Sequence, residues 1–263
     1  MFYLREKRGQ LDYLLQSRFY IFSMKNSNKR ADNAIMNPTG GTRMGRPKYF
    51  RYGEKEIAYL KSKDKKLAAV IDAVGPIRRE TDGDLFSSVV RHIVGQQISN
   101  KALAAVWGRL TEGLGTVDAA TVLRAGEERL HGFGMSYRKA AYISDFARKV
   151  GNGEFSLSAL KKMDDAAAIA ALSALKGIGV WTAEMILLFC LERPDVLSFG
   201  DLAIQRGLRM VYRHREITRA QFERYRRRYS PYGSVASLYL WAVSGGALPG
   251  VADPAERKRG KKS

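Results

Sequence analysis

Helical spacing of apolar residues limits the fold of this chain more than any other feature of its sequence. Apolar pairs recur every four residues from Leu85/Phe86 to Ile93/Val94, which places them on one face of a helix. The alternation of Val, Ile and Thr that is typical of strands is missing. The sequence therefore predicts an all-α fold, and it shows no internal repeat.

Several helices can be placed along the chain from the same periodicity. Thr81 and Asp84 have the spacing of a capping box, which marks the start of the first of these helices. Further helices are expected over residues 100–110, 138–150, 164–175, 180–191, 202–212 and 234–243.

The two ends of the chain differ in composition from the part between them. Residues 1–46 are rich in polar residues, Gly, Pro and Asn after a short stretch that could form an amphipathic helix, so we expect a disordered basic extension. Residues 47–250 are expected to form the folded domain, and 251–263 a basic tail. Because the first residues are charged and no run of 18 apolar residues occurs, we expect a cytoplasmic protein, associated with the nucleoid if it is bacterial.

The chain carries 45 Lys and Arg residues against 26 acidic ones, a formal net charge of +19. Such a charge favours a polyanionic partner, either nucleic acid or an anionic membrane, although a charge spread evenly for solubility remains an alternative. No helix sets an apolar face against a clean Lys/Arg face, which disfavours the membrane.

Cysteine and histidine are too few to build a metal or redox centre. Cys190 is the single cysteine, which excludes an intrachain disulfide and a four-thiolate cluster, and its apolar surroundings indicate a buried, inert thiol. The three histidines lack the spacing of metal ligands. We therefore expect no cofactor and no catalytic metal.

The segment Leu-Lys-Gly-Ile-Gly-Val-Trp-Thr-Ala at residues 175–183 joins two expected helices. Gly177 suits the left-handed position after a helix, and Gly179 opens the next helix without a side chain. A phosphate could approach the N–H groups at that helix start closely, because glycine has no Cβ. An ordinary helix–turn–helix corner would also use glycines here.

A second segment, residues 198–208, reads Ser-Phe-Gly-Asp-Leu-Ala-Ile-Gln-Arg-Gly-Leu and places Asp201 at a helix start. Aspartate is a preferred N-cap, so a purely structural role is one interpretation. A carboxylate that stabilises charge in a reaction is the other.

Together these segments resemble the helix-hairpin-helix (HhH-GPD) DNA glycosylase superfamily, over residues 48–246. The resemblance implies a two-lobed fold with a cleft between the lobes, with Asp201 as the catalytic residue. It implies a hairpin that grips a DNA phosphate through backbone N–H groups. The residues it assigns to DNA binding there are Lys176, Gly177, Gly179 and Thr182, and a monovalent cation is expected at carbonyls near Leu175 and Gly177.

Trp181 stands where bifunctional members of the superfamily carry a lysine that forms a Schiff base, so the resemblance implies a monofunctional enzyme. In the 3-methyladenine DNA glycosylase II branch a tryptophan at this position lies beside the base pocket, and an indole attracts a cationic purine. Tyr137 and Trp241 are further candidates for the pocket. Core packing explains these aromatic residues equally well.

Residues 93–99, Ile-Val-Gly-Gln-Gln-Ile-Ser, resemble the family's loop that fills the gap left by an extruded base. Gln97 is the first candidate for this wedge and Ile98 the second, and a helix end followed by a polar turn is the alternative. The resemblance implies a monomeric enzyme that excises alkylated purines of the 3-methyladenine type from double-stranded DNA. A glycosylase for uracil or hypoxanthine, or a non-enzymatic DNA-binding module, would carry many of the same features.

Overall fold

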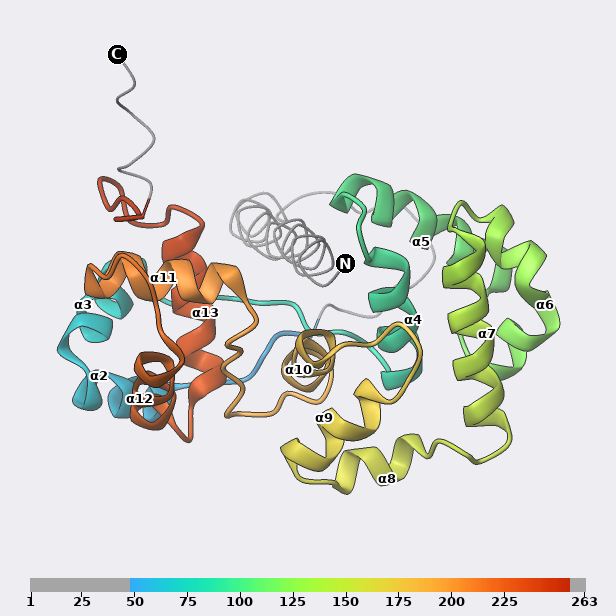
Figure 1. Ribbon diagram of the computed structural model, residues 1–263, viewed down its shortest axis with the longest axis horizontal. Helices are drawn as coiled ribbons and strands as arrows, with labels where there is room; N and C mark the ends of the chain where they lie inside the picture. Colours follow the sequence, from blue (N-terminus) through green and yellow to red (C-terminus); the bar gives the residue numbers. More distant parts are fainter. Residues whose placement is uncertain (1–47, 256–263) are drawn as a thin grey trace, which may run out of the picture. The chain divides into compact units, whose positions relative to one another are not determined.

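The computed structural model describes residues 48–255 (Figure 1), and these residues form helices without a strand. The predicted all-α class is therefore confirmed. The extension expected over residues 1–46 and the last residues of the expected tail lie outside the described part. The chain divides into two compact units: unit 2 comprises Asp82–Leu191, and unit 1 comprises the segments before and after it.

Unit 1 is built around one central helix. Its helices are α2 (Glu54–Lys63), α3 (Lys65–Val74), α11 (Leu202–Tyr212), α12 (Arg219–Tyr229) and α13 (Gly233–Ser244). The last of these packs against each of the other four, and all but one of its residues are buried. A helix that is apolar on all sides belongs in the interior, which explains why α13 forms the core of the unit.

The backbones of α11 and α13 approach each other closely at Gly207. A Cβ added to this residue would lie 2.3 Å from the carbonyl oxygen of Leu240, far inside van der Waals contact. Only glycine fits at this crossing, and it fixes the position of α11 relative to the central helix.

Buried polar contacts tie other elements of unit 1 together. Asp64 caps α3 by accepting hydrogen bonds from the N–H groups of Lys66 and Leu67 at 2.9 and 3.0 Å. Its second oxygen accepts from the Tyr212 hydroxyl at 2.8 Å and from Arg228, so one carboxylate joins α3, α11 and α12.

The unit extends beyond the expected domain end at residue 250. Asp253 is buried and accepts a hydrogen bond from Arg209 Nε at 3.0 Å, with a second bond from the same guanidinium. The first residues of the expected tail, 251–255, are thus anchored to α11 through Asp253.

Unit 2 contains seven helices within the described residues, and two of them organise it. They are α4 (Leu85–Gly95), α5 (Asn100–Leu114), α6 (Ala119–Gly132), α7 (Tyr137–Gly151), α8 (Leu157–Lys162), α9 (Asp165–Ser173) and α10 (Val180–Phe189). The nearly wholly buried α10 packs on α9 and α4, and α7 packs on α6 and α4.

The start of α4 differs from the expectation. Its N-cap is Asp84, whose side chain accepts from the N–H of Ser87 at 3.0 Å, and not Thr81. The amide of Thr81 instead donates to the carbonyl of Lys48 at 2.9 Å. The capping-box interpretation was wrong because aspartate is itself a strong N-cap and begins the helix three residues later.

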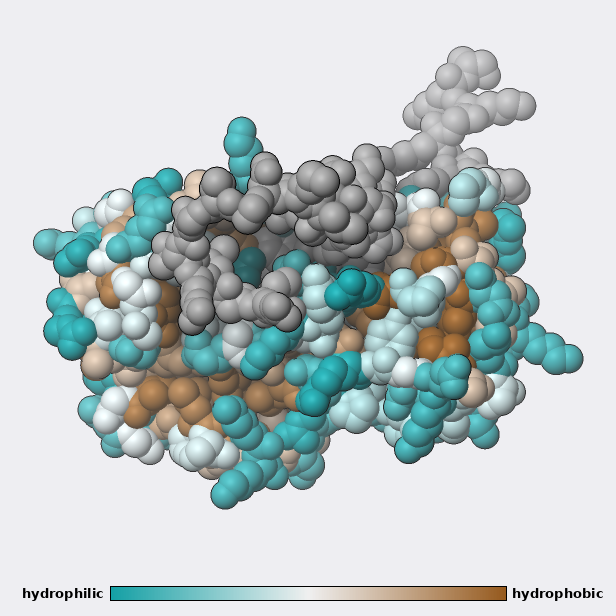
Figure 2. Space-filling view, turned by 180° about the vertical axis from the view of Figure 1, so that it is seen from behind, coloured by the Kyte–Doolittle hydropathy of each residue, from teal (hydrophilic) through white to brown (hydrophobic). Residues whose placement is uncertain are grey.

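Apolar side chains are gathered inside the units, and the surface is mainly polar. In the space-filling view, hydrophilic residues cover most of the visible described surface and apolar ones show between them (Figure 2). Cys190 is half-buried, and burial raises the pKa of its thiol to about 12, which fits the inert role expected for it. Within the described residues, every helix is too short or too polar to span a bilayer.

Candidate active site

Asp201 forms the N-cap of α11 and is only 1% exposed. Its Oδ1 accepts hydrogen bonds from the N–H groups of Ala203 and Ile204, both at 2.9 Å. The positive end of the helix dipole favours a negative charge at this place. The capping role and a chemical role are compatible.

The chain before Asp201 is held in place by side chains of unit 1. Gln205, in the first turn of α11, donates from Nε2 to the carbonyl of Phe199 at 2.6 Å. The Phe199 ring meets Phe222 of α12 edge-on, with 5.1 Å between ring centroids. These contacts fix the entry to the helix, so the carboxylate has a defined position.

The hairpin between α9 and α10 has the backbone that the sequence predicted. Gly177 has a φ of +84°, and a Cβ on it would lie 2.4 Å from the ring of Tyr142. The turn closes with a hydrogen bond of 3.1 Å from the N–H of Ile178 to the carbonyl of Leu175. Gly177 is thus required by both its conformation and its neighbour.

Gly179 is the N-cap of α10 and provides no side-chain cap for the first turn of that helix. It is exposed, and a Cβ on it would meet nothing within 4 Å. The next residue, Val180, is also exposed. An uncapped, open helix start of this kind is the arrangement that binds a phosphate.

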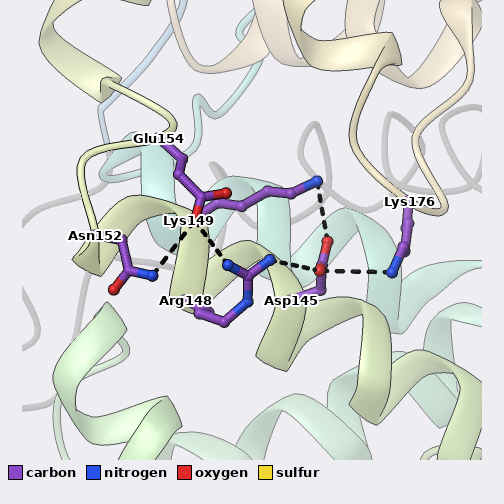
Figure 3. Close-up of polar contacts among 6 residues, drawn as sticks. All are labelled: Asp145, Arg148, Lys149, Asn152, Glu154 and Lys176. Carbon is purple, nitrogen blue, oxygen red and sulfur yellow. Dashed lines mark hydrogen bonds and ion pairs between the residues drawn. The ribbon is translucent and has the colours of Figure 1, made fainter.

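The side chains assigned to the hairpin differ in what they can contact. Lys176 has a side chain that is 63% exposed, and its Nζ lies 3.5 Å from Asp145 of α7 (Figure 3). Thr182 is buried in the first turn of α10, as Trp181 beside it is. The DNA-binding role of Lys176, Gly177, Gly179 and Thr182 stays a prediction.

The carbonyls expected to hold a monovalent cation already accept hydrogen bonds. Leu175 takes the N–H of Ile178, and Gly177 takes the side-chain amide of Gln96. An amide donor facing Gly177 does not fit a cation at that oxygen, so we derive no step from a bound ion.

The expected wedge loop follows directly after α4. Gln97 has a φ of 57° and an exposed side chain, whereas Ile98 is half-buried. A left-handed conformation is unfavourable for glutamine and is often retained at functional sites. The loop is therefore built to present Gln97, which supports the order of preference between the two candidates.

The three aromatic candidates for the base pocket lie in different surroundings. Trp181 is 5% exposed in the first turn of α10. Tyr137 is 57% exposed and stacks on His131 with 3.9 Å between ring centroids, so core packing does not explain it. Trp241 is 1% exposed within α13, where core packing is the role that its burial supports.

Within unit 2 the structure brings two of the candidate segments together. The amide of Gln96 links the wedge loop to the hairpin carbonyl of Gly177. Lys139 of α7 also reaches this loop, donating to the carbonyl of Gln96 at 2.6 Å. Neither Gln96 nor Lys139 had a role predicted from the sequence, although a lysine on the apolar face of an amphipathic helix was a usable signal.

Comparison with known proteins shows the family to which this chain belongs. The family model described as "HhH-GPD superfamily base excision DNA repair protein" matches residues 90–231. A DNA-3-methyladenine glycosidase from Bacillus halodurans is 35% identical, with a TM-score of 0.69, over 76% of this chain and 93% of that one.

Two comparisons with Schizosaccharomyces pombe point the same way. Its DNA-3-methyladenine glycosylase 1 is 26% identical over 73% of this chain and 86% of its own length. A structure of a 3-methyladenine DNA glycosylase from this yeast with abasic DNA is 25% identical, with a TM-score of 0.65, over 74% of this chain and 98% of that one. Because the family model spans more than half of the sequence and the fold agrees, the chain belongs to the HhH-GPD superfamily of base excision DNA repair proteins.

Proposed function

We propose that the protein is a monofunctional DNA glycosylase that hydrolyses the N-glycosidic bond of alkylated purines, of the 3-methyladenine type, in double-stranded DNA. The observation that carries the proposal is the buried carboxylate of Asp201, which the N–H groups of Ala203 and Ile204 hold at the start of α11. Phosphate binding has no need of a carboxylate at this place. The names of the similar proteins, several of them 3-methyladenine glycosylases, support the same substrate class.

DNA binding is assigned to unit 2. The open helix start at Gly179 would hold a phosphate through backbone N–H groups, and such contacts position a protein without reading the bases. Gln97 would fill the gap in the stack when the damaged base leaves it. Trp181 would stack on the extruded base, where an electron-rich indole favours a cationic purine over a neutral one. A relative solved with abasic DNA supports duplex DNA as the partner.

The reaction needs one carboxylate and one water. As the bond between C1′ and the purine nitrogen breaks, its electrons pass to the alkylated base, which leaves as a neutral molecule. The sugar acquires oxocarbenium character, and the negative charge of Asp201 stabilises it. Water then attacks C1′, its proton passes to Asp201, and an abasic site remains. Trp181 offers no amine for a Schiff base, so no strand cleavage follows.

We propose that the protein acts as a monomer. The test is a release assay with the wild-type protein on duplexes that contain 3-methyladenine, hypoxanthine or uracil. Free base is measured by chromatography, and borohydride trapping is run in parallel. We expect release of the methylated purine without a trapped complex. Release of only hypoxanthine or uracil would show that the enzyme excises a neutral base and not an alkylated purine. A trapped complex would overturn the monofunctional assignment. Binding without any release would indicate a DNA-binding module.

A further inference from the structure

Lys139 holds the end of the helix from which the wedge loop begins. Its Nζ donates hydrogen bonds to the carbonyls of Val94 and Gln96, at 2.8 and 2.6 Å. These carbonyls lie at the C-terminal end of α4, where the helix dipole is negative and a cation is favoured. Gln97, with its left-handed backbone, follows the second of them directly.

The ammonium of Lys139 is committed to this contact. The side chain is half-buried, and burial, together with the neighbouring Arg138, lowers the pKa of Lys139 to about 8. Within the described residues its Nζ forms no ion pair with a carboxylate. Burial makes the charged form less favourable than in an exposed lysine, so the ammonium depends on the two carbonyls that compensate it.

The same face of α7 also contacts the hairpin. Tyr142, three residues after Lys139, has its ring so close to Gly177 that a Cβ there would lie 2.4 Å from it. Three residues further on, Asp145 receives Lys149, Arg148 and the hairpin residue Lys176 (Figure 3). Side chains three residues apart share one helix face, so α7 reaches both segments from one side. The amide of Gln96 completes the link by donating to the carbonyl of Gly177.

We propose that Lys139 is a positioning residue for base extrusion: its ammonium fixes the end of α4 so that Gln97 stands in register with the phosphate-binding hairpin. The inference rests on the proposed function, since it assumes that Gln97 enters the base stack. Lys139 touches neither substrate nor reacting atoms. It acts through the backbone of the wedge loop.

Removing the ammonium should slow extrusion and leave phosphate binding intact. Without it, the two carbonyls would turn toward water, and the unfavourable conformation of Gln97 could relax. A misplacement of about 1 Å can cost roughly 100-fold in rate, so we expect Lys139→Met to lower the single-turnover excision rate roughly 10- to 100-fold. Affinity for undamaged duplex should match that of a control that loses an equal charge elsewhere.

The experiment compares wild type, Lys139→Met, Lys139→Arg and the charge-matched control Lys61→Met. Lys61 pairs with Asp72 at 2.6 Å on the surface of unit 1, which carries none of the residues assigned to DNA binding. Each protein is measured for excision rate, for affinity to undamaged duplex, and for fluorescence of 2-aminopurine placed beside the alkylated base. The fluorescence reports departure of the damaged base from the stack.

We expect the Met variant to lose rate and fluorescence response together, the Arg variant to recover both through its own donors, and Lys61→Met to behave as wild type. If the Met variant does not fold, Lys139→Gln, whose amide is too short to reach both carbonyls, carries the same expectation. Wild-type rate and fluorescence in the folded Met or Gln variant would overturn the inference. Absence of excision by the wild type would instead refute the proposed function itself.

Discussion

Replacing Gly207 with alanine should destabilise unit 1 and displace the helix that carries Asp201. The new Cβ would lie 2.3 Å from the carbonyl oxygen of Leu240, where ordinary contacts begin at 3.4 Å. The neighbour is backbone and cannot rotate away, so α11 must move relative to α13. Overpacking against backbone lies at the upper end of the usual range, about 3 kcal/mol. The higher helix propensity of alanine returns about 1 kcal/mol, which leaves a net loss of about 2 kcal/mol.

Calorimetry provides the assay, and Gly108 provides a matched control. Gly108 lies inside α5, and a Cβ on it would meet nothing within 4 Å, so Gly108→Ala should gain the helix propensity without a clash. At roughly 2–4 °C per kcal/mol, Gly207→Ala should lower Tm by about 4–8 °C, and Gly108→Ala should raise it by a few degrees. Excision by Gly207→Ala should fall as well, because α11 positions the carboxylate. Equal stabilisation by both substitutions would refute the close approach of α11 and α13.

Two further predictions concern the hairpin and the response to acid. Gly179→Ala adds a Cβ in open space at an ordinary φ of −94°, so no clash lowers Tm, and the poorer capping by alanine costs only about 1 kcal/mol. Binding should weaken equally for damaged and undamaged duplex, and the log–log salt slope should fall by about 0.9 for each phosphate that the variant fails to bind. Anisotropy titrations at two salt concentrations measure this, and weakening confined to damaged duplex would exclude the hairpin as the phosphate site. Burial raises the pKa of Asp64, but hydrogen bonds from Leu67, Arg228 and Tyr212 outweigh it, and the net pKa is lowered below 3.8. A lowered pKa gives stability that is present above pH 3.8 and is lost as the pH falls through the folded-state value. The stability difference between wild type and Asp64→Asn, from urea unfolding, should therefore shrink below about pH 4, and a constant difference would contradict the assignment.

Local signals in the sequence were enough to place the elements that carry the site. The helix expected over residues 202–212 is found as α11 (Leu202–Tyr212), because an aspartate cap and a strong apolar stripe coincide there. The hairpin glycines were recognised for the same reason, since the left-handed position at Gly177 is a local requirement. The sequence places the start of α4 wrongly at Thr81, because Thr81 and Asp84 are both good capping residues and stand three positions apart.

Other helices gave weaker signals. The helix α12 is mostly arginine and polar residues, and only Phe222, Tyr225 and Tyr229 mark its buried face. Their spacing of three and four residues was present in the sequence but was hidden by the charge around it. The helix α6 is broken at Gly126, which has a φ of 72°. The break interrupts the spacing of the apolar residues, so this helix is also hard to predict from the sequence.

Contacts between distant segments could not be predicted from the sequence. Gln96 and Gly177 are 81 residues apart, and Lys139 meets the carbonyl of Val94 across 45 residues. Backbone carbonyls carry no residue identity, so nothing in the sequence indicates which of them a lysine will bind. Likewise Tyr137 and Trp241 looked equivalent as pocket candidates, and only the structure separates the exposed ring from the buried one.

The most direct test of the central claim is the rate at which Asp201→Asn releases methylated purine from alkylated duplex DNA. Asparagine is an equally good N-cap, so its side-chain oxygen can keep the hydrogen bonds to Ala203 and Ile204 and the fold should persist. The control is Asp164→Asn, the same exchange at the exposed N-cap of α9. We predict that Asp201→Asn abolishes release while binding to abasic DNA is kept, and that Asp164→Asn is fully active. Release by Asp201→Asn within a few-fold of wild type would remove Asp201 from the mechanism.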